Sequence, residues 1–307
     1  MDSDPDMHRP TIPPGLWAEM ARLGPVWGQD VGGHIARMTE AFSALLAQRP
    51  EDGVRCTADI AYGPHTRHRL DIHHPPSRPT MAPGLIFVHG GAFVQGDRNK
   101  TPQIYSNVLQ CFARRGVVGV NIGYRLADAA RYPGASVDVG AAVAWVRDNA
   151  DDLGVDPQRL FLMGHSAGGA HAASYALNRA LQPSAGPGLA GLIVVSGRVR
   201  ADTEKDNPNA AKVIAYYGPS PEVHEAASAV SHVTSDSLPV LVAWAEFENP
   251  LIDLHSAELV HALARARRRS PPVVWLRGHN HTSSIAHLGT TEQLLEDAVC
   301  DFIANPR

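Results

Sequence analysis

Residues 164–169, Gly-His-Ser-Ala-Gly-Gly, constrain the fold more than any other stretch of the chain. A short apolar run, residues 159–163, precedes them, and an alanine-rich run, residues 170–177, follows. A strand that enters a G-x-S-x-G turn and leaves it as a helix is the context of a nucleophile elbow. Glycines at positions 164 and 168 let the turn close tightly, so Ser166 would stand exposed at the strand end. A glycine-rich turn that merely packs on a sheet is the alternative, and the flanking strand and helix favour the nucleophile.

The rest of the chain alternates between predicted strands and predicted helices. Strands separated by helices of about 10–15 residues form βαβ units with a parallel sheet. The sequence therefore predicts an α/β fold with a mostly parallel central sheet and helices on both faces. The strands are expected within residues 54–73 and at 85–88, 117–122, 159–163, 192–196, 239–244 and 272–276, and the helices at 102–114, 135–150, 170–177, 254–268 and 290–303.

Two regions depart from this alternation. Residues 1–50 join a polar, proline-bearing start to two short helices, and residues 51–307 form the main domain. The first region could pack on the core or cap a site, and the sequence leaves both open. Residues 198–237 lack clear periodicity and carry turn signals, so we expect a loop or a small insertion there.

Composition excludes several classes of protein. Of 307 residues, 44% are hydrophobic and 19% charged, and the net charge of −4 gives no reason to expect nucleic acid. Three distant cysteines form neither a disulfide framework nor a C-x-x-C metal motif. The acidic start is unlike a signal peptide, and no apolar run reaches the roughly 18 residues of a membrane span. We therefore expect a cytoplasmic protein that binds neither nucleic acid nor membrane.

A second glycine-rich strand end is predicted at residues 89–93, His-Gly-Gly-Ala-Phe. Acyl transfer places negative charge on the former carbonyl oxygen, and hydrogen-bond donors must already point at that oxygen. The amides of Gly90 and Gly91, with that of Ala167, are the candidate oxyanion hole. A phosphate cradle is the weaker alternative, because neither G-x-x-x-x-G-K-[ST] nor a G-x-G-x-x-G helix start is present.

A nucleophilic serine needs a base, and His279, His281 and His287 follow the last predicted strand. His281 directly precedes the next helical stretch, whereas His279 lies nearer the strand end. The His-x-His spacing could also bind a metal, but no Asp, Glu or Cys flanks it. We predict a catalytic histidine, with His279 and His281 competing, and no metal.

The third member of a triad orients the imidazole, and either Asp or Glu can do this. Glu246, Glu248 and Asp253 follow the strand that ends at Trp244. Glu246 and Glu248 would share one side of a continued strand, so alternation does not separate them. Asp253 would lie in the first turn of the next helix, where an acid favours the helix dipole.

These motifs together resemble the hormone-sensitive-lipase-like carboxylesterases, and among them the branch of arylformamidases and feruloyl-type esterases. The likeness covers roughly residues 60–305 and implies the α/β-hydrolase fold. The family's acid, in a segment like G-E-x-D-P, falls on Glu248, and its G-x-x-H histidine falls on His281. The implied triad is Ser166, Glu248 and His281. Ala92 replaces a third glycine of the lipase-like members, and the acid is Glu rather than Asp, so Glu246 and Asp253 remain open.

The resemblance implies a serine hydrolase that cleaves small carboxylic esters through an acyl-enzyme and uses no cofactor. An arylformamidase-type amide hydrolase is the alternative, and a catalytically inactive binding protein is a minor one. Phe93, Trp17 or Trp27 could line an acyl pocket, although each is more simply a core aromatic. An exposed edge strand or helix could pair two subunits into a homodimer.

Overall fold

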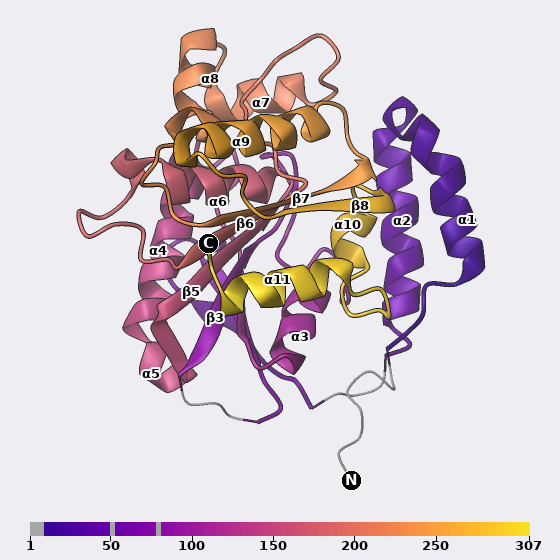
Figure 1. Cartoon of the computed structure of the whole chain (residues 1–307), viewed down its shortest axis with the longest axis horizontal. Helices are drawn as coiled ribbons and strands as arrows, with labels where there is room; N and C mark the ends of the chain where they lie inside the picture. Colours follow the sequence, from indigo (N-terminus) through magenta and orange to yellow (C-terminus); the bar gives the residue numbers. More distant parts are fainter. Residues whose placement is uncertain (1–8, 50–52, 78–80) are drawn as a thin grey trace.

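The computed structural model describes residues 9–49, 53–77 and 81–307, and these residues form one eight-stranded sheet (Figure 1). The strand order is β1-β2-β4-β3-β5-β6-β7-β8. β2 runs antiparallel to both of its neighbours, and the other pairs are parallel, which confirms the predicted α/β class. The strands are β1 (Arg55–Ala61), β2 (Arg69–His74), β3 (Ala82–Val88), β4 (Val118–Ile122), β5 (Val155–His165), β6 (Gly191–Val195), β7 (Val240–Phe247) and β8 (Val273–Asn280).

Helices cover both faces of the sheet (Figure 1). Successive side chains of a strand point to opposite faces, so Ile86 and Val88 pack in one hydrophobic cluster while Leu85 and Phe87 pack in the other. The first cluster includes residues of α4 (Gly134–Asp148), α6 (Ala167–Leu177) and α9 (Ile252–Arg267), and the second includes residues of α1 (Pro14–Leu23), α2 (Val31–Leu46), α3 (Ser106–Arg114) and α11 (Leu294–Ala304). The shorter elements are η1 (Gly24–Gln29), α5 (Ala150–Leu153), η2 (Arg179–Leu181), α7 (Ala210–Tyr217), α8 (Pro221–Ala227), η3 (Ala229–His232) and α10 (Ser283–Ala286).

The N-terminal helices share the core of the sheet. Met20, Trp27 and Phe42 are at most 1% exposed and belong to the cluster under the second face. Before α1, the Arg9 guanidinium forms a buried bidentate pair with Glu296 of α11, at 2.5 and 2.8 Å. The region is therefore anchored by both apolar packing and a buried ion pair. The acidic first residues of the sequence lie outside the described ranges, and the boundary at residue 50 stays a prediction.

The segment 198–237 is an insertion between β6 and β7 that contains α7, α8 and η3. Of the two alternatives predicted for this segment, a loop or a small insertion, the structure has the small insertion. α7 has 8 residues and α8 has 7, about two turns each, too short for a helical period to stand out. Tyr216 and Tyr217 of α7 are buried; Tyr216 stacks on Phe93 and Tyr217 meets it edge-on, so all three are core aromatics.

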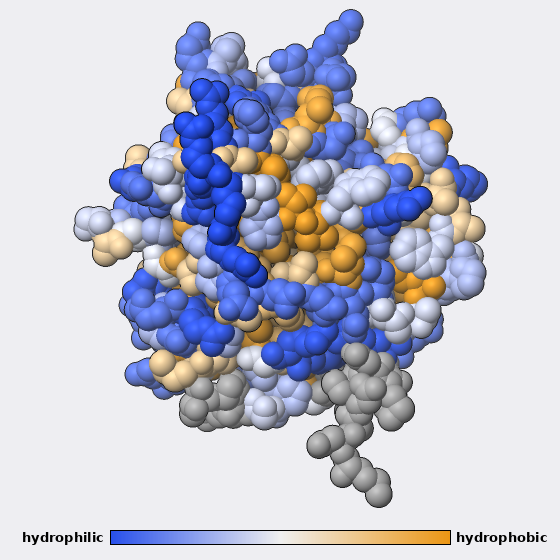
Figure 2. All heavy atoms as spheres, in the orientation of Figure 1, coloured by the Kyte–Doolittle hydropathy of each residue, from blue (hydrophilic) through white to orange (hydrophobic). Residues whose placement is uncertain are grey.

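Figure 2 shows apolar residues gathered near the middle of this face, with smaller apolar areas elsewhere on it. β8 is an edge strand, and its side chains Val273 and Trp275 are 41% and 50% exposed. The predicted homodimer stays a prediction, for which this edge is a candidate contact. Among the described residues, no helix combines the length and apolarity needed to cross a bilayer.

Candidate active site

The nucleophile elbow forms at the junction of β5 and α6. Ser166 has φ 56° and ψ −124°, a conformation that is strained for a residue with a side chain. The two motif glycines permit it: a Cβ on Gly164 would lie 2.4 Å from the Gly168 carbonyl oxygen, and one on Gly168 would lie 2.1 Å from that of Val88. The turn therefore holds Ser166 at the carboxyl end of the central strands.

Ser166, His281 and Glu248 lie in one hydrogen-bonded line. The Ser166 hydroxyl lies 3.0 Å from His281 Nε2, and His281 Nδ1 lies 2.6 Å from Glu248 Oε2. A neutral imidazole protonated on Nδ1 donates to Glu248 and accepts from Ser166, which is the tautomer a general base requires. The loops after β5, β7 and β8 supply the three residues. The structure thus brings together the three residues predicted as the triad.

The competing carboxylates occupy other places. Glu246 accepts a hydrogen bond from the Gly278 amide at 2.8 Å, which bridges β7 and β8. Asp253 is exposed in the first turn of α9. Glu248 lies one residue beyond β7, so strand alternation no longer applies to it, and its side chain is 2% exposed.

The Glu248 carboxylate is held by two further donors. The Ser196 hydroxyl donates to Oε1 at 2.5 Å, and the Ala245 amide donates to the same oxygen at 2.8 Å. His281 is held in turn by Ser284, whose hydroxyl donates to the His281 carbonyl at 2.9 Å. Ser196 is not among the predicted site residues, although it directly follows β6 at the same sheet edge.

A second chain of hydrogen bonds runs behind the triad. The Gly90 amide donates to the Tyr105 hydroxyl at 3.3 Å, and that hydroxyl lies 3.4 Å from His165 Nδ1. His165 Nε2 lies 3.0 Å from the His281 carbonyl oxygen. Burial, and then the neighbouring His281, lower the pKa of His165 well below 6.5, so its imidazole is neutral. A neutral His165 can accept from Tyr105 and donate to His281, which links the loop at Gly90 to the catalytic histidine.

The predicted oxyanion donors come from the loop after β3 and from the start of α6, next to Ser166. A Cβ on Gly90 would lie 3.0 Å from Ser166 Cβ, so this backbone passes close to the nucleophile. Gly91 has φ 149°, and a Cβ there would lie 1.8 Å from the Gln95 carbonyl oxygen. Ala167 is the first residue of α6, where helix amides lack internal partners. Because the Gly90 amide already bonds Tyr105, the amides of Gly91 and Ala167 are the better-placed candidates, and the trio stays a prediction.

A cavity of about 350 Å³ opens over Ser166 and His281. Val31, Gly32 and Ile35 of α2 line one part of it, and Pro208, Asn209 and Lys212 line another. The N-terminal helices and the insertion at residues 198–237 thus both contribute walls of the cavity. Its lining, drawn from the described residues, includes none of the aromatics Trp17, Trp27 and Phe93.

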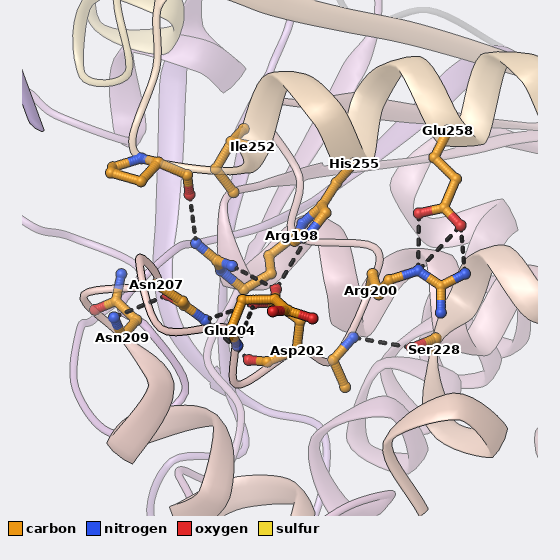
Figure 3. Close-up of polar contacts among 12 residues, drawn as sticks. Arg198, Arg200, Asp202, Glu204, Asn207, Asn209, Ser228, Ile252, His255 and Glu258 are labelled. Atoms are coloured by element: carbon orange, nitrogen blue, oxygen red, sulfur yellow. Dashed lines mark hydrogen bonds and ion pairs between the residues drawn. The ribbon is translucent and has the colours of Figure 1, made fainter. Parts of the chain in front are cut away.

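A buried polar network supports the loop that carries Glu248 (Figure 3). The Arg198 amide donates to the Ser166 carbonyl at 3.2 Å, and its guanidinium donates to the Pro250 carbonyl at 3.2 Å. Asp202 pairs with Arg198 at 3.0 Å and with His255 at 3.0 Å. Arg198 is 4% exposed, so these contacts replace the water it has lost. Arg198 therefore ties the elbow to the acid loop, a role with no local sequence signal.

His279 lies outside the triad. Its Nδ1 is 3.1 Å from the Ser283 hydroxyl, and its ring meets Trp17 edge-on at 5.2 Å. Of the two competing histidines, His281 is therefore the one that contacts Ser166.

Comparison with known proteins places this geometry in a family. The BD-FAE family model matches residues 70–280. Esterase LipQ of Mycobacterium tuberculosis is 30% identical over 267 residues, 80% of this chain and 62% of that protein. An ethyl acetate hydrolase of Pseudomonas putida is 33% identical over 150 residues, 48% of this chain and 46% of that protein. The chain thus spans less than two thirds of the length of these two relatives.

Solved structures share the fold. An inhibited esterase B from Lactobacillus rhamnosis matches with a TM-score of 0.73 at 20% identity, over 94% of this chain and 96% of that one. A hyperthermophilic esterase from the archaeon Pyrobaculum calidifontis matches with a TM-score of 0.71 at 22% identity, over 95% and 98%. These similarities establish the α/β-hydrolase fold. Because the family model runs from β2 to the end of β8 and includes both Ser166 and Glu248, the chain belongs to the BD-FAE family.

Proposed function

We propose that this protein is a serine carboxylesterase that cleaves small carboxylic esters through an acyl-enzyme. The observation that carries the proposal is the continuous contact from Ser166 through His281 to Glu248, at 3.0 and 2.6 Å. The relatives named esterase LipQ and ethyl acetate hydrolase support the choice of ester chemistry.

In the proposed mechanism His281 Nε2 takes the Ser166 proton while Oγ forms a bond to the ester carbonyl carbon. The carbonyl oxygen becomes an oxyanion and accepts hydrogen bonds from the amides of Gly91 and Ala167. The Gly90 amide can act as a third donor only by giving up its hydrogen bond to the Tyr105 hydroxyl. Glu248 stabilises the imidazolium. His281 then protonates the leaving alkoxide, and a water attacks the acyl-enzyme with His281 again as base, which releases the acid and restores Ser166.

A cavity of about 350 Å³ suits a small acyl or alcohol group. The same machinery can attack an amide, so an arylformamidase-type activity stays the alternative. In both cases every step uses protein side chains, backbone amides and water. We keep the cytoplasmic location as a prediction.

The test is hydrolysis of p-nitrophenyl acetate through decanoate, N-formylkynurenine and methyl ferulate by wild type and Ser166→Ala. We expect turnover of a short ester and a loss of roughly 10⁴-fold or more in kcat for the variant. Faster turnover of the formamide than of the esters would instead assign the amide hydrolase. If neither protein turns over any substrate and a phosphonate leaves Ser166 unlabelled, the enzyme proposal is wrong.

A further inference from the structure

Three potential metal ligands converge behind the catalytic histidine. His279 is the second-to-last residue of β8, His287 follows α10, and Glu292 precedes α11. One ligand atom from each residue lies within 4.8 Å of the other two. His287 Nε2 is 2.9 Å and His279 Nε2 is 3.8 Å from Glu292 Oε2. The histidines are 0% and 2% exposed, so these donors face a protein interior rather than water.

Both imidazoles are oriented through their other nitrogen by one residue. His279 Nδ1 is 3.1 Å from the Ser283 hydroxyl, and His287 Nδ1 is 2.7 Å from the Ser283 carbonyl oxygen. His287 Nδ1 can only donate to that carbonyl, which leaves the lone pair of a neutral imidazole on Nε2. A histidine fixed through one ring nitrogen by a carbonyl or hydroxyl, with the other nitrogen free, is the arrangement of metal-bound histidines.

The short contact between His287 and Glu292 is not an aligned hydrogen bond. His287 Nε2 and Glu292 Oε2 are both buried atoms without a hydrogen-bond partner among the described residues, although they lie 2.9 Å apart. Because His287 Nδ1 donates to the Ser283 carbonyl, Nε2 of a neutral His287 and the Glu292 carboxylate oxygen are two acceptors at contact distance. Two acceptor atoms lie this close together when both bind the same cation.

The spacing fits a zinc ion. Ligand atoms at about 2.0–2.1 Å from a tetrahedral Zn²⁺ are separated by roughly 3.3 Å. The two observed separations from Glu292 Oε2, 2.9 and 3.8 Å, lie on either side of that value. The Glu292 side chain is 26% exposed although its Oε2 is buried, and a water would complete the four ligands of the ion.

We propose that His279, His287 and Glu292 form a zinc site that braces the loop carrying the catalytic histidine. His279 is two residues before His281 in the chain, and its ring contacts Trp17 of α1. A bound ion would cross-link β8, the segment after α10 and the segment before α11. The site is separate from the triad and does not depend on the proposed esterase activity.

The test is zinc binding by the full chain after dialysis against a chelator. We expect one Zn²⁺ per chain by equilibrium dialysis with metal analysis, and a rise in Tm of about 5 °C at an excess of zinc over Kd. Co²⁺ should give the visible absorption of a tetrahedral site. Binding should also change the fluorescence of Trp17, a change that Trp17→Phe removes.

The variants His287→Ala and Glu292→Gln should each lose the stoichiometric ion, the cobalt absorption and the Tm rise. His261→Ala removes an exposed histidine of α9 and should keep all three. Circular dichroism without metal shows whether each variant folds. If His287→Ala does not fold, Glu292→Gln, which preserves the shape of the side chain, still tests the site. Equal zinc binding by wild type and Glu292→Gln, or none by wild type, would overturn the proposal and leave an ordinary buried histidine–glutamate pair.

Discussion

At the residue scale, the acid of the triad gives the sharpest prediction. Glu248→Gln keeps the size of the side chain but removes the charge that holds His281 protonated on Nδ1. We expect kcat for p-nitrophenyl acetate to fall by roughly 10³–10⁴-fold, because the wrong tautomer then faces Ser166. Glu246→Gln is the matched control, since Glu246 bonds only the Gly278 amide among the described residues, and its kcat should stay within a few-fold. A larger loss for Glu246→Gln than for Glu248→Gln would contradict the assignment.

Individual site residues differ in how far sequence could identify them. Ser166 and the two flanking glycines form a local pattern, because the strained turn needs those residue types at those positions. Glu248 was assigned only through the family resemblance, because it lies past the end of β7 where periodicity carries no information. Tyr105 and His165 act through contacts with residues up to 116 positions away, and no local pattern reports such contacts.

At the scale of elements, η1 is joined directly to the acid loop. Trp27 Nε1 donates to Asn249 Oδ1 at 2.8 Å, and Asn249 is next to Glu248 in the chain and only 6% exposed. A Cβ on Gly24 would lie 2.3 Å from the Phe247 ring, so the same loop packs tightly against η1 on its other side. The N-terminal region thus supports the catalytic acid as well as lining the cavity.

Trp27→Phe tests this connection. The ring stays, but a buried amide oxygen loses its donor, which costs about 1–3 kcal/mol. We expect a Tm lower by a few degrees and a kcat reduced several-fold, measured by thermal unfolding and by ester hydrolysis. Trp17→Phe is the control, because the Trp17 indole nitrogen has no hydrogen bond to the described residues. Equal effects of the two variants would remove the link between η1 and the acid.

The elements themselves were predicted according to their length and periodicity. The buried strands and the long helices α4, α9 and α11 were placed within a few residues, because a full period is visible in each. α7 and α8 were missed because two turns do not define a period. That α2 would reach the cavity depends on packing between distant segments, which periodicity does not describe.

At the scale of the whole molecule, the cavity is lined by positive side chains although the chain carries a negative net charge. The net charge is −4, yet Lys100 and Lys212 line the cavity, its lining includes no Asp or Glu, and neither lysine has an ion-pair partner among the described residues. We expect the KM of a p-nitrophenyl ester with a free carboxylate, such as the monosuccinate, to be lower than that of the butyrate. Added salt should raise the KM of the anionic ester alone.

Lys100→Gln with Lys212→Gln should remove this preference and leave the KM of the butyrate ester unchanged. Lys205→Gln, on the segment before α7 and outside the cavity lining, is the control for net charge. If the double variant still prefers the anionic ester, the preference comes from elsewhere in the molecule.

The stability of the whole fold should fall in mild acid because neutral histidines are buried in its centre. Burial lowers the pKa of His89 to about 4 and that of His171 to about 3. The His171 ring is 1% exposed among Phe93, Tyr124 and Tyr216, and both of its nitrogens lack hydrogen-bond partners among the described residues. An imidazolium in that position would be desolvated without compensation.

The unfolded chain protonates these histidines near pH 6.5, whereas the folded protein does so only near pH 4 and pH 3. Between these values the unfolded state binds more protons, so stability is complete above pH 6.5 and decreases as the pH falls. Each histidine contributes a loss of roughly 3 kcal/mol by pH 4.

Buried carboxylates act in the same direction at lower pH. Burial alone would raise the pKa of Asp138, but the hydrogen bonds from Arg125 outweigh burial, and the net pKa of Asp138 lies below its ordinary value. Thermal unfolding from pH 7 to pH 4 should show a falling Tm, and His171→Phe should make the fall less steep because one of these buried imidazoles is gone. Parallel curves for wild type and His171→Phe would show that His171 contributes nothing to the acid sensitivity.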